Sequence, residues 1–354
     1  INLLIAILLL NGCENKEFNI EANKEYEDVS DKIEDAILYE IKNKKLNAIS
    51  ISIVKDQKIL LAKGYGYENK ATKRLADANT IYRVGSVSKL FTDMAIMLKQ
   101  ENGEINIDDP INNYIPEFVP NNPYDTPITL RQLMSHRSGL LREPRIGNYF
   151  DNQNTSLKET VKSINASTLI YEPETKIKYS NAAIAVAGYV LEKIDNQPYV
   201  EIMQKNILNT LSMKNSSFAP NIKINKRLAK ATMWSYDGRS FDAPTFQLGM
   251  IPAGSLYASV TDLSNFLMMI FNNGKINNKQ FINEKTLKAM LEPQYSTNRK
   301  FGYGIGFRLS EHNDFLKIGH GGAIYGYSTQ LSAIPEIKTG IIVSSSVDLT
   351  NSIT

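Results

Sequence analysis

The sequence contains little cysteine and little histidine, which limits the chemistry that its side chains can perform. Its single cysteine, Cys13, allows no disulfide bond within the chain of 354 residues. The three histidines, His136, His312 and His320, lie far apart and do not form the HExxH pattern of a metal site. We therefore expect no metal and no cofactor.

An excess of charge of one sign is also lacking. The 40 Lys and Arg residues nearly balance the 37 Asp and Glu residues, for a net charge of +3. Basic stripes with interleaved aromatic residues are missing, so we expect no nucleic-acid partner. A hydrophobic content of 42% and a charged content of 22% are typical of a globular protein. A chain of this length buries a large core in one or two domains.

The apolar run at the N-terminus, residues 1–10, has about half the length that spans a bilayer. It is typical of the hydrophobic region of a signal peptide, and the stretch Leu10-Asn11-Gly12-Cys13 that follows resembles a bacterial lipobox. We expect residues 1–13 to be a signal-peptide remnant with Cys13 as the lipidated residue, and residues 14–28 to be a tether. The protein would then be exported and lipid-anchored in a bacterial cell envelope, periplasmic or at the surface. In the alternative, Cys13 is an incidental thiol of an ordinary secreted or membrane-anchored protein.

The most informative stretch is Ser86-Val87-Ser88-Lys89, which opens an apolar run of helical character. Residues three apart share a face of a helix, so Ser86 and Lys89 are expected to point the same way. A serine hydroxyl becomes a nucleophile when a base takes its proton. Burial can lower the pKa of a lysine until it serves as that base. A helix start also directs free backbone N–H groups toward a developing anion.

This pattern alone is weak, because a serine at a helix start is also a good N-cap. A second copy, from Ser52 to Lys55, lies in an alternating apolar run that predicts a strand over residues 48–54. Residues three apart on a strand lie on opposite faces, so Ser52 and Lys55 cannot act together. Other motifs must decide the role of Ser86.

Two later motifs add suitable groups. In the Tyr-Ser-Asn stretch at 179–181, Tyr179 beside a cation can be a phenolate or pass protons. Asn181 offers both a donor and an acceptor to a substrate amide. The stretch from His320 to Ala323 predicts a strand with one polar side chain, followed by glycine backbone that a substrate can approach closely.

The order Ser-x-x-Lys, Tyr-x-Asn, His-x-Gly resembles the serine β-lactamase-like family, which includes class C β-lactamases, DD-peptidases and related esterases. The resemblance covers roughly residues 30 to 350 and includes the stretches 107–118, 128–140, 171–175 and 301–307. It implies an α+β fold: an antiparallel sheet flanked by helices, with an inserted, mostly helical domain.

The resemblance also implies a role for each motif residue. Ser86 would attack a carbonyl and form an acyl-enzyme, and Lys89 and Tyr179 would move its proton, with the choice of base left open. The backbone N–H groups of Ser86 and Ala323 would bind the oxyanion. Asn181, His320 and Gly322 would complete the substrate-binding site.

A literal Lys-Thr-Gly, the third motif of class C β-lactamases, occurs at 338–340. It follows Pro335-Glu336 between two strand-like runs, which predicts a hairpin turn rather than a site. We therefore interpret His320 as the third motif residue. Histidine lacks the fixed charge of lysine, and in this respect the chain resembles DD-peptidases, D-amino-acid peptidases and esterases more than dedicated β-lactamases.

The apolar pattern outlines the organisation. Apolar residues four apart predict a helix from Val29 to Ile41, and strands follow at 48–54 and 59–66. Strands return between 304 and 346. We predict a sheet domain from 29–107 and 293–354, and a helical domain from 108–292, with the site between them. The family closes with a C-terminal helix, and the chain starts with Ile1, so we expect truncation at both ends.

We therefore predict a serine hydrolase that acts on amide or ester bonds of D-amino-acid peptides or small esters. One alternative is a β-lactamase, and another is a non-catalytic scaffold lipoprotein. The expected partners are a small-molecule or peptide substrate and, through the lipid, a membrane.

Overall fold

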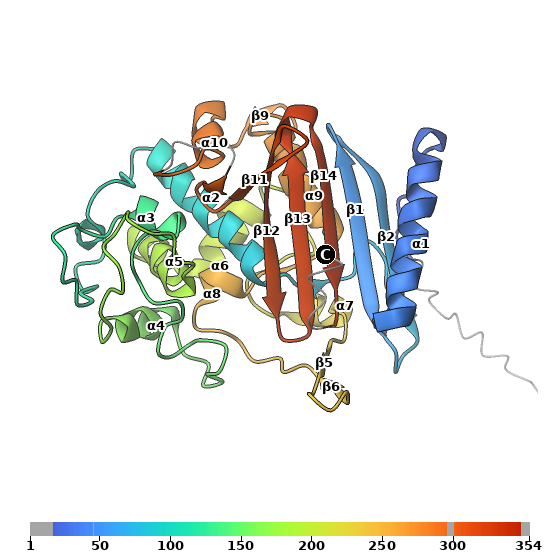
Figure 1. Ribbon diagram of the computed structural model, residues 1–354, viewed down its shortest axis with the longest axis horizontal. Helices are drawn as coiled ribbons and strands as arrows, with labels where there is room; N and C mark the ends of the chain where they lie inside the picture. Colours follow the sequence, from blue (N-terminus) through green and yellow to red (C-terminus); the bar gives the residue numbers. More distant parts are fainter. Residues whose placement is uncertain (1–16, 45, 296–300, 348–354) are drawn as a thin grey trace, which may run out of the picture.

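An eight-stranded antiparallel sheet forms the centre of the computed structural model, which describes residues 17–44, 46–295 and 301–347 (Figure 1). The strand order is β10-β11-β12-β13-β14-β1-β2-β3. The strands are β1 Ala48–Lys55, β2 Lys58–Asn69, β3 Arg74–Leu75, β10 Gly302–Tyr303, β11 Arg308–His312, β12 Phe315–Ile324, β13 Tyr327–Ile334 and β14 Thr339–Ser345. Because β14 pairs with β1 from Ile49↔Ser345 to Lys55↔Thr339, the two ends of the chain build one sheet.

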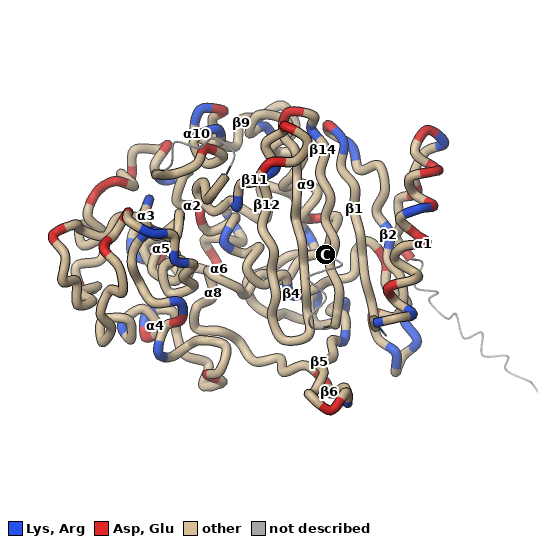
Figure 2. Tube along the Cα trace, viewed as in Figure 1, with Lys and Arg blue, Asp and Glu red and all other residues tan. Residues whose placement is uncertain are grey.

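Helices cover both faces of this sheet. The helix α1, Glu27–Lys44, packs its apolar stripe, centred on Ile37, against Ile49 and Ile51 of β1. On the opposite face α9, Val260–Phe271, contacts β1, β2 and β14. The Ser52 hydroxyl of β1 lies 2.8 Å from that of Ser264 in α9. Acidic residues prevail along α1, and lysines lie in its last turn (Figure 2).

Other helices gather beyond the β12 side of the sheet around α5, Asn181–Asp195 (Figure 1). They are α2 Ser88–Glu101, α3 Leu130–Met134, α4 Leu157–Ile164, α6 Tyr199–Ile202 and α8 Ile251–Gly254, each of which contacts α5. The helices α7 Ile222–Arg227 and α10 Glu284–Met290 lie outside this group (Figure 1). Ser180 caps α5, since its hydroxyl accepts a hydrogen bond from the Ala183 N–H. Gly188 lets α8 approach, because a Cβ there would lie 2.1 Å from Pro252.

Short strand pairs complete the fold: β4 Tyr82–Arg83 with β7 Tyr257–Ala258, β5 Thr232–Trp234 with β6 Ser240–Asp242, and β8 Lys275–Ile276 with β9 Lys279–Gln280. The β4–β7 pair matters for the site. It holds the chain just before Ser86 against the segment after α8, and the Val84 N–H donates to the Leu256 carbonyl.

The predicted antiparallel sheet flanked by helices is confirmed. The segment Lys338-Thr339-Gly340 belongs to the hairpin between β13 and β14, where Lys338 adopts a left-handed φ of 49°. The division into 29–107 with 293–354, and 108–292, stays a prediction; α9 falls within the second range but packs on the sheet.

Some predictions fall on other parts of the chain. Cys13, the lipobox and residues 348–354 lie outside the described residues. Within the described ranges, the structure has no helix whose length and hydropathy would let it cross a membrane.

Candidate active site

Ser86 lies in a tight turn pressed against the backbone of β12. The turn is the 3₁₀ helix η2, Gly85–Val87, which leads directly into α2. A Cβ on Gly85 would lie 2.8 Å from the Ala323 nitrogen, and one on Gly322 would lie 2.0 Å from the Val84 carbonyl oxygen. These glycines therefore allow β12 to run directly beside the serine turn, whereas from the sequence we expected the glycine backbone to admit a substrate.

The N-cap interpretation of Ser86 is wrong. The cap position of α2 is Val87, whose side chain makes no capping hydrogen bond. Instead the Lys89 ammonium donates to the Ser86 hydroxyl, with 2.9 Å between Nζ and Oγ. The turn itself is held by Ser88, which donates to the Gly85 carbonyl and accepts from the Leu256 N–H.

Lys89 is fully buried, and its only other hydrogen-bond partner among the described residues is the Ala253 carbonyl oxygen, at 2.6 Å. Burial lowers the pKa of Lys89 to about 7, against the opposing pull of the Glu143 and Asp93 carboxyls. Asp93, one turn further along α2, is also buried, and burial raises its own pKa well above the usual value. Its carboxyl oxygens have no hydrogen-bond partner among the described residues. Burial thus weakens the tendency of Asp93 to hold Lys89 in its charged form.

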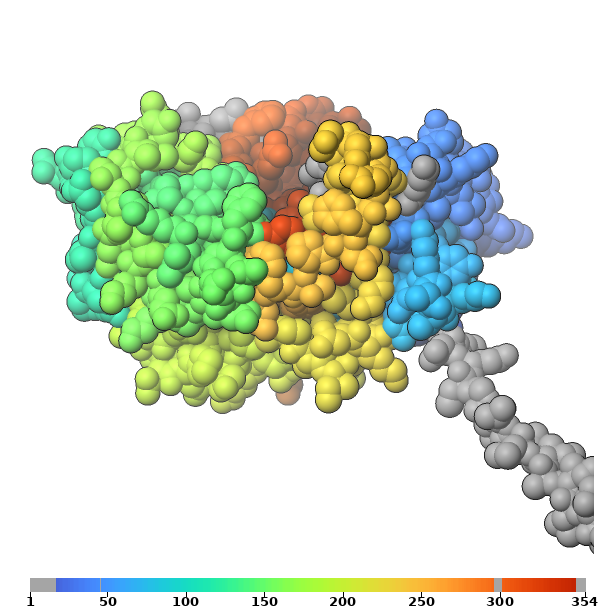
Figure 3. Space-filling view, turned by 90° about the horizontal axis from the view of Figure 1, so that it is seen from below, coloured from blue at the N-terminus to red at the C-terminus, as the bar shows by residue number. Residues whose placement is uncertain are grey.

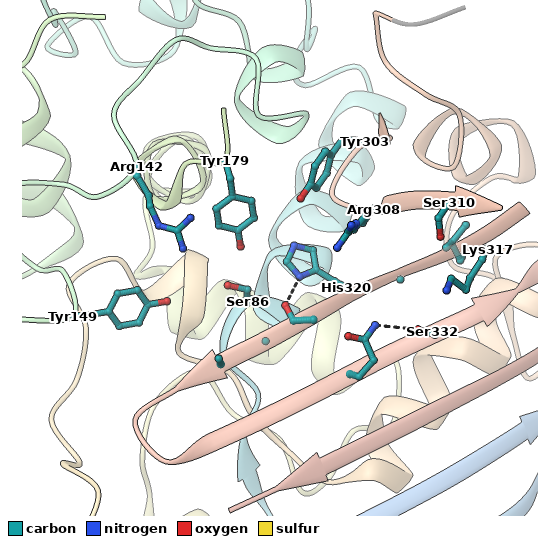
Figure 4. Close-up of a pocket in the computed structure, with 16 residues that line it drawn as sticks. Ser86, Arg142, Tyr149, Tyr179, Tyr303, Arg308, Ser310, Lys317, His320 and Ser332 are labelled. Carbon is teal, nitrogen blue, oxygen red and sulfur yellow. Dashed lines mark hydrogen bonds between the residues drawn. The ribbon is translucent and has the colours of Figure 1, made fainter. Parts of the chain in front are cut away.

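Tyr179 lies at the end of the loop before α5 and points toward Ser86 (Figure 4). Its ring centroid is 5.0 Å from Lys89 Nζ and 4.3 Å from the centroid of the His136 ring. Burial raises the pKa of Tyr179 far above that of a free tyrosine, against a smaller lowering by the Ser86 hydroxyl. Tyr179 is thus a protonated phenol that can donate, and a resting phenolate is not favoured.

His320 faces the site from β12 and is uncharged at neutral pH. Burial, together with the nearby Lys89, lowers the pKa of His320 to about 3. Its Nδ1 lies 2.6 Å from the Gly321 carbonyl oxygen, which assigns the proton to Nδ1. Its Nε2 has no hydrogen-bond partner among the described residues and can accept a hydrogen bond.

Asn181 is less accessible than the sequence suggested. It is the first residue of α5, is 1% exposed and does not line the cavity beside Ser86. Its amide donates to Glu143, with 2.7 Å between Nδ2 and Oε1. One of its two amide N–H donors is therefore engaged by the protein, and its carbonyl oxygen has no partner among the described residues.

The cavity has a volume of about 800 Å³ and opens between the helical part and the sheet. Figure 3 shows it from below as a hollow between the green and the yellow-orange parts of the chain, with the late strands, in red, at its base. Its wall includes the predicted Ser86, Tyr179, His320, Gly322 and Ala323. Lys89 lies behind this wall, bonded to Ser86.

Several residues that line the cavity belong to none of the three motifs and were not predicted from the sequence. Arg142 and Tyr149 come from the loop between α3 and α4, and their side chains lie on one side of Ser86 (Figure 4). Arg308 and Lys317 come from β11 and β12 on the other side. Residues in irregular loops show no periodic pattern in the sequence. One clue was that Arg142 closely follows the 128–140 stretch that resembles the family. Within the described part of the chain, no acidic residue lines the cavity.

A family model described as Beta-lactamase matches residues 33–352. The chain belongs to the Beta-lactamase family. This confirms the resemblance predicted from the three motifs.

This Beta-lactamase family member covers different shares of its individual relatives. It is 26% identical over 321 residues to "Protein flp" of Staphylococcus aureus, covering 89% of this chain but 62% of that protein. Less than two thirds of that relative is thus represented here. The octameric penicillin-binding protein homologue from Pyrococcus abyssi is 27% identical, with a TM-score of 0.79 over 90% of this chain and 73% of that one. The D-amino acid amidase from Ochrobactrum anthropi SV3 shares the fold at 21% identity, with a TM-score of 0.74 over 90% of this chain and 91% of that one.

Proposed function

We propose that the chain is a serine hydrolase that cleaves amide or ester bonds through an acyl-enzyme on Ser86. The observation that carries this proposal is the 2.9 Å contact between the Ser86 hydroxyl and a fully buried Lys89. With its pKa lowered to about 7, chiefly by burial, a large fraction of Lys89 is neutral at physiological pH. A neutral amine at hydrogen-bond distance can act as a general base.

In this scheme Lys89 accepts the Ser86 proton as the hydroxyl oxygen attacks the substrate carbonyl. The tetrahedral oxyanion accepts hydrogen bonds from the backbone N–H groups of Ser86 and Ala323, each worth about 3 kcal/mol of barrier. Tyr179, a protonated phenol, donates its proton to the leaving group and recovers one from Lys89. Water then hydrolyses the acyl-enzyme. The raised pKa of Tyr179, caused by burial, favours Lys89 as the base.

The substrate is proposed to be a D-amino-acid peptide or a small ester, as for a DD-peptidase, a D-aminopeptidase or an esterase. The neutral His320 brings no charge to the site. Positive charge comes instead from Arg142, Arg308 and Lys317 on the cavity wall. Arg308 and Lys317, which lie together on one side of Ser86, favour a substrate with a carboxylate on its leaving half.

A panel of D-Ala-D-Ala peptides, p-nitrophenyl esters and cephalosporins tests this choice. We expect Ser86-dependent cleavage of a peptide or an ester, with slow turnover of nitrocefin. Rapid nitrocefin turnover would favour the β-lactamase alternative, which is consistent with the family match. Absence of labelling by a fluorophosphonate or a fluorescent penicillin would favour the non-catalytic scaffold.

We also propose that Cys13 anchors the protein to a bacterial membrane through a lipid. The support is the sequence from Leu10 to Cys13 after an apolar run. Expression of the full-length protein with radiolabelled palmitate should label it, and Cys13→Ser should abolish the label and release the protein. Equal labelling of Cys13→Ser would refute the anchor.

A further inference from the structure

Two buried acceptor oxygens near the proposed nucleophile have no donor. They are Oε2 of Glu143 and Oδ1 of Asn181, and neither has a hydrogen-bond partner among the described residues. The two side chains are in direct contact, since Asn181 Nδ2 donates to Glu143 Oε1. Buried polar atoms in native proteins are nearly always paired, so an orphaned pair of the same polarity points to a donor from outside the chain.

The contacts of the neighbouring donors are directed at other atoms. Arg142 Nε lies 3.2 Å from Glu143 Oε1, the same oxygen that the Asn181 amide contacts. The Lys89 ammonium donates to Ser86 and Ala253. The structure therefore leaves one carboxyl oxygen of Glu143 and the amide oxygen of Asn181 without a donor among the described residues, in two side chains that contact each other.

This pair lies beside the reaction centre. Glu143 is the first of the charges that oppose the lowering of the Lys89 pKa by burial. Its side chain is 25% exposed, and its neighbour Arg142 lines the cavity. Figure 4 places Arg142 and Tyr149 on the side of Ser86 opposite Arg308, so the two halves of a substrate would meet different groups.

We propose that Glu143 and Asn181 bind a free ammonium group on the acyl half of the substrate. An ammonium offers three donors and no acceptor, and its charge complements the carboxylate. An N-acylated substrate would bring a single uncharged N–H in place of the three charged donors of an ammonium, together with a carbonyl oxygen that accepts and would face the Glu143 carboxyl. The proposal rests on the hydrolase function above and selects amino-acid amides and esters with a free α-amino group over N-acylated peptides.

The test compares D-alanine p-nitroanilide with N-acetyl-D-alanine p-nitroanilide, using kcat/KM. We expect the free amine to be preferred by at least about 10-fold, and Glu143→Gln to reduce this ratio by about 10- to 100-fold, as for lost hydrogen bonds to a charged group. The ratio cancels general effects of the substitution on folding or on Lys89. Glu201→Gln, an exposed glutamate on α6, is the matched control and should leave the ratio unchanged.

A binding measurement avoids any need for turnover. Calorimetry on Ser86→Ala protein should give D-alaninamide a Kd at least about 10-fold lower than N-acetyl-D-alaninamide. Equal affinities, or a ratio that Glu143→Gln leaves unchanged, overturn the ammonium site alone. Hydrolysis that survives Ser86→Ala overturns the proposed acyl-enzyme on Ser86, so the two failures are distinguishable.

Discussion

At the scale of single residues, the proposed chemistry depends on the protonation state of Lys89. Because burial lowers its pKa from 10.5 to about 7, kcat/KM for p-nitrophenyl propionate should rise with pH and level off above about pH 8. His320, with its pKa lowered to about 3 by burial, stays neutral across this range and adds no second step. A midpoint near the usual pKa of lysine, or a flat profile, would contradict the assignment.

Lys89→Met separates chemistry from packing, because methionine is apolar and fills much of the space of the lysine stem. We expect kcat/KM to fall by about 100- to 10,000-fold. The same pKa gives the sign for stability: between pH 7 and 10.5 the unfolded protein binds more protons at Lys89, so the free energy of unfolding should rise with pH. Urea unfolding of Lys89→Met should lose this contribution. Retention of full activity by Lys89→Met would exclude Lys89 as the base.

Motif residues could be predicted because their chemistry and order in the chain are visible in the sequence. The placement of Arg142, Glu143 and Tyr149 could not be predicted. They lie in the irregular connection between α3 and α4, whose path depends on packing against α5 rather than on local periodicity. The engagement of the Asn181 donor by Glu143 was hidden for the same reason.

At the scale of secondary-structure elements, the site depends on the close approach of β12 to the turn η2. Gly322→Ala should force these backbones apart, because the added Cβ would lie 2.0 Å from the Val84 carbonyl oxygen. We expect kcat/KM to fall about 100-fold or more, since oxyanion donors act only at correct distance. Gly321→Ala is the matched control. Its Cβ would meet the movable Gln330 side chain, so a loss as large as that of Gly322→Ala would refute the argument.

Regular elements followed from their patterns more readily than this turn did. Apolar residues at helical spacing predicted α1, and alternation predicted β1 and β2. The 3₁₀ turn at Gly85–Val87 was expected to be the start of the α-helix. Its tighter form follows from contact with β12 and from the Ser88 hydrogen bond to Gly85, both of which need the folded chain.

At the scale of the whole molecule, β14 joins the late strands to β1 and packs its inner face on α9. Ile342, fully buried, and Ile341, which is 37% exposed, are neighbours on opposite faces of β14. Ile342→Asp should prevent folding, because an unpaired charge would enter the core. Ile341→Asp should change the free energy of unfolding by less than about 1 kcal/mol. Circular dichroism and urea unfolding measure both, and cooperative unfolding of Ile342→Asp at wild-type stability would contradict this role.

The central claim is that Ser86 is the acylated nucleophile, and active-site labelling tests it most directly. A fluorophosphonate probe followed by peptide mapping should find the adduct on Ser86, with labelling lost in Ser86→Ala. Ser52→Ala is the matched control, since Ser52 begins the second Ser-x-x-Lys pattern but is buried against Ser264 in the sheet. Labelling should persist in Ser52→Ala. An adduct on another residue, or undiminished labelling of Ser86→Ala, would contradict the account.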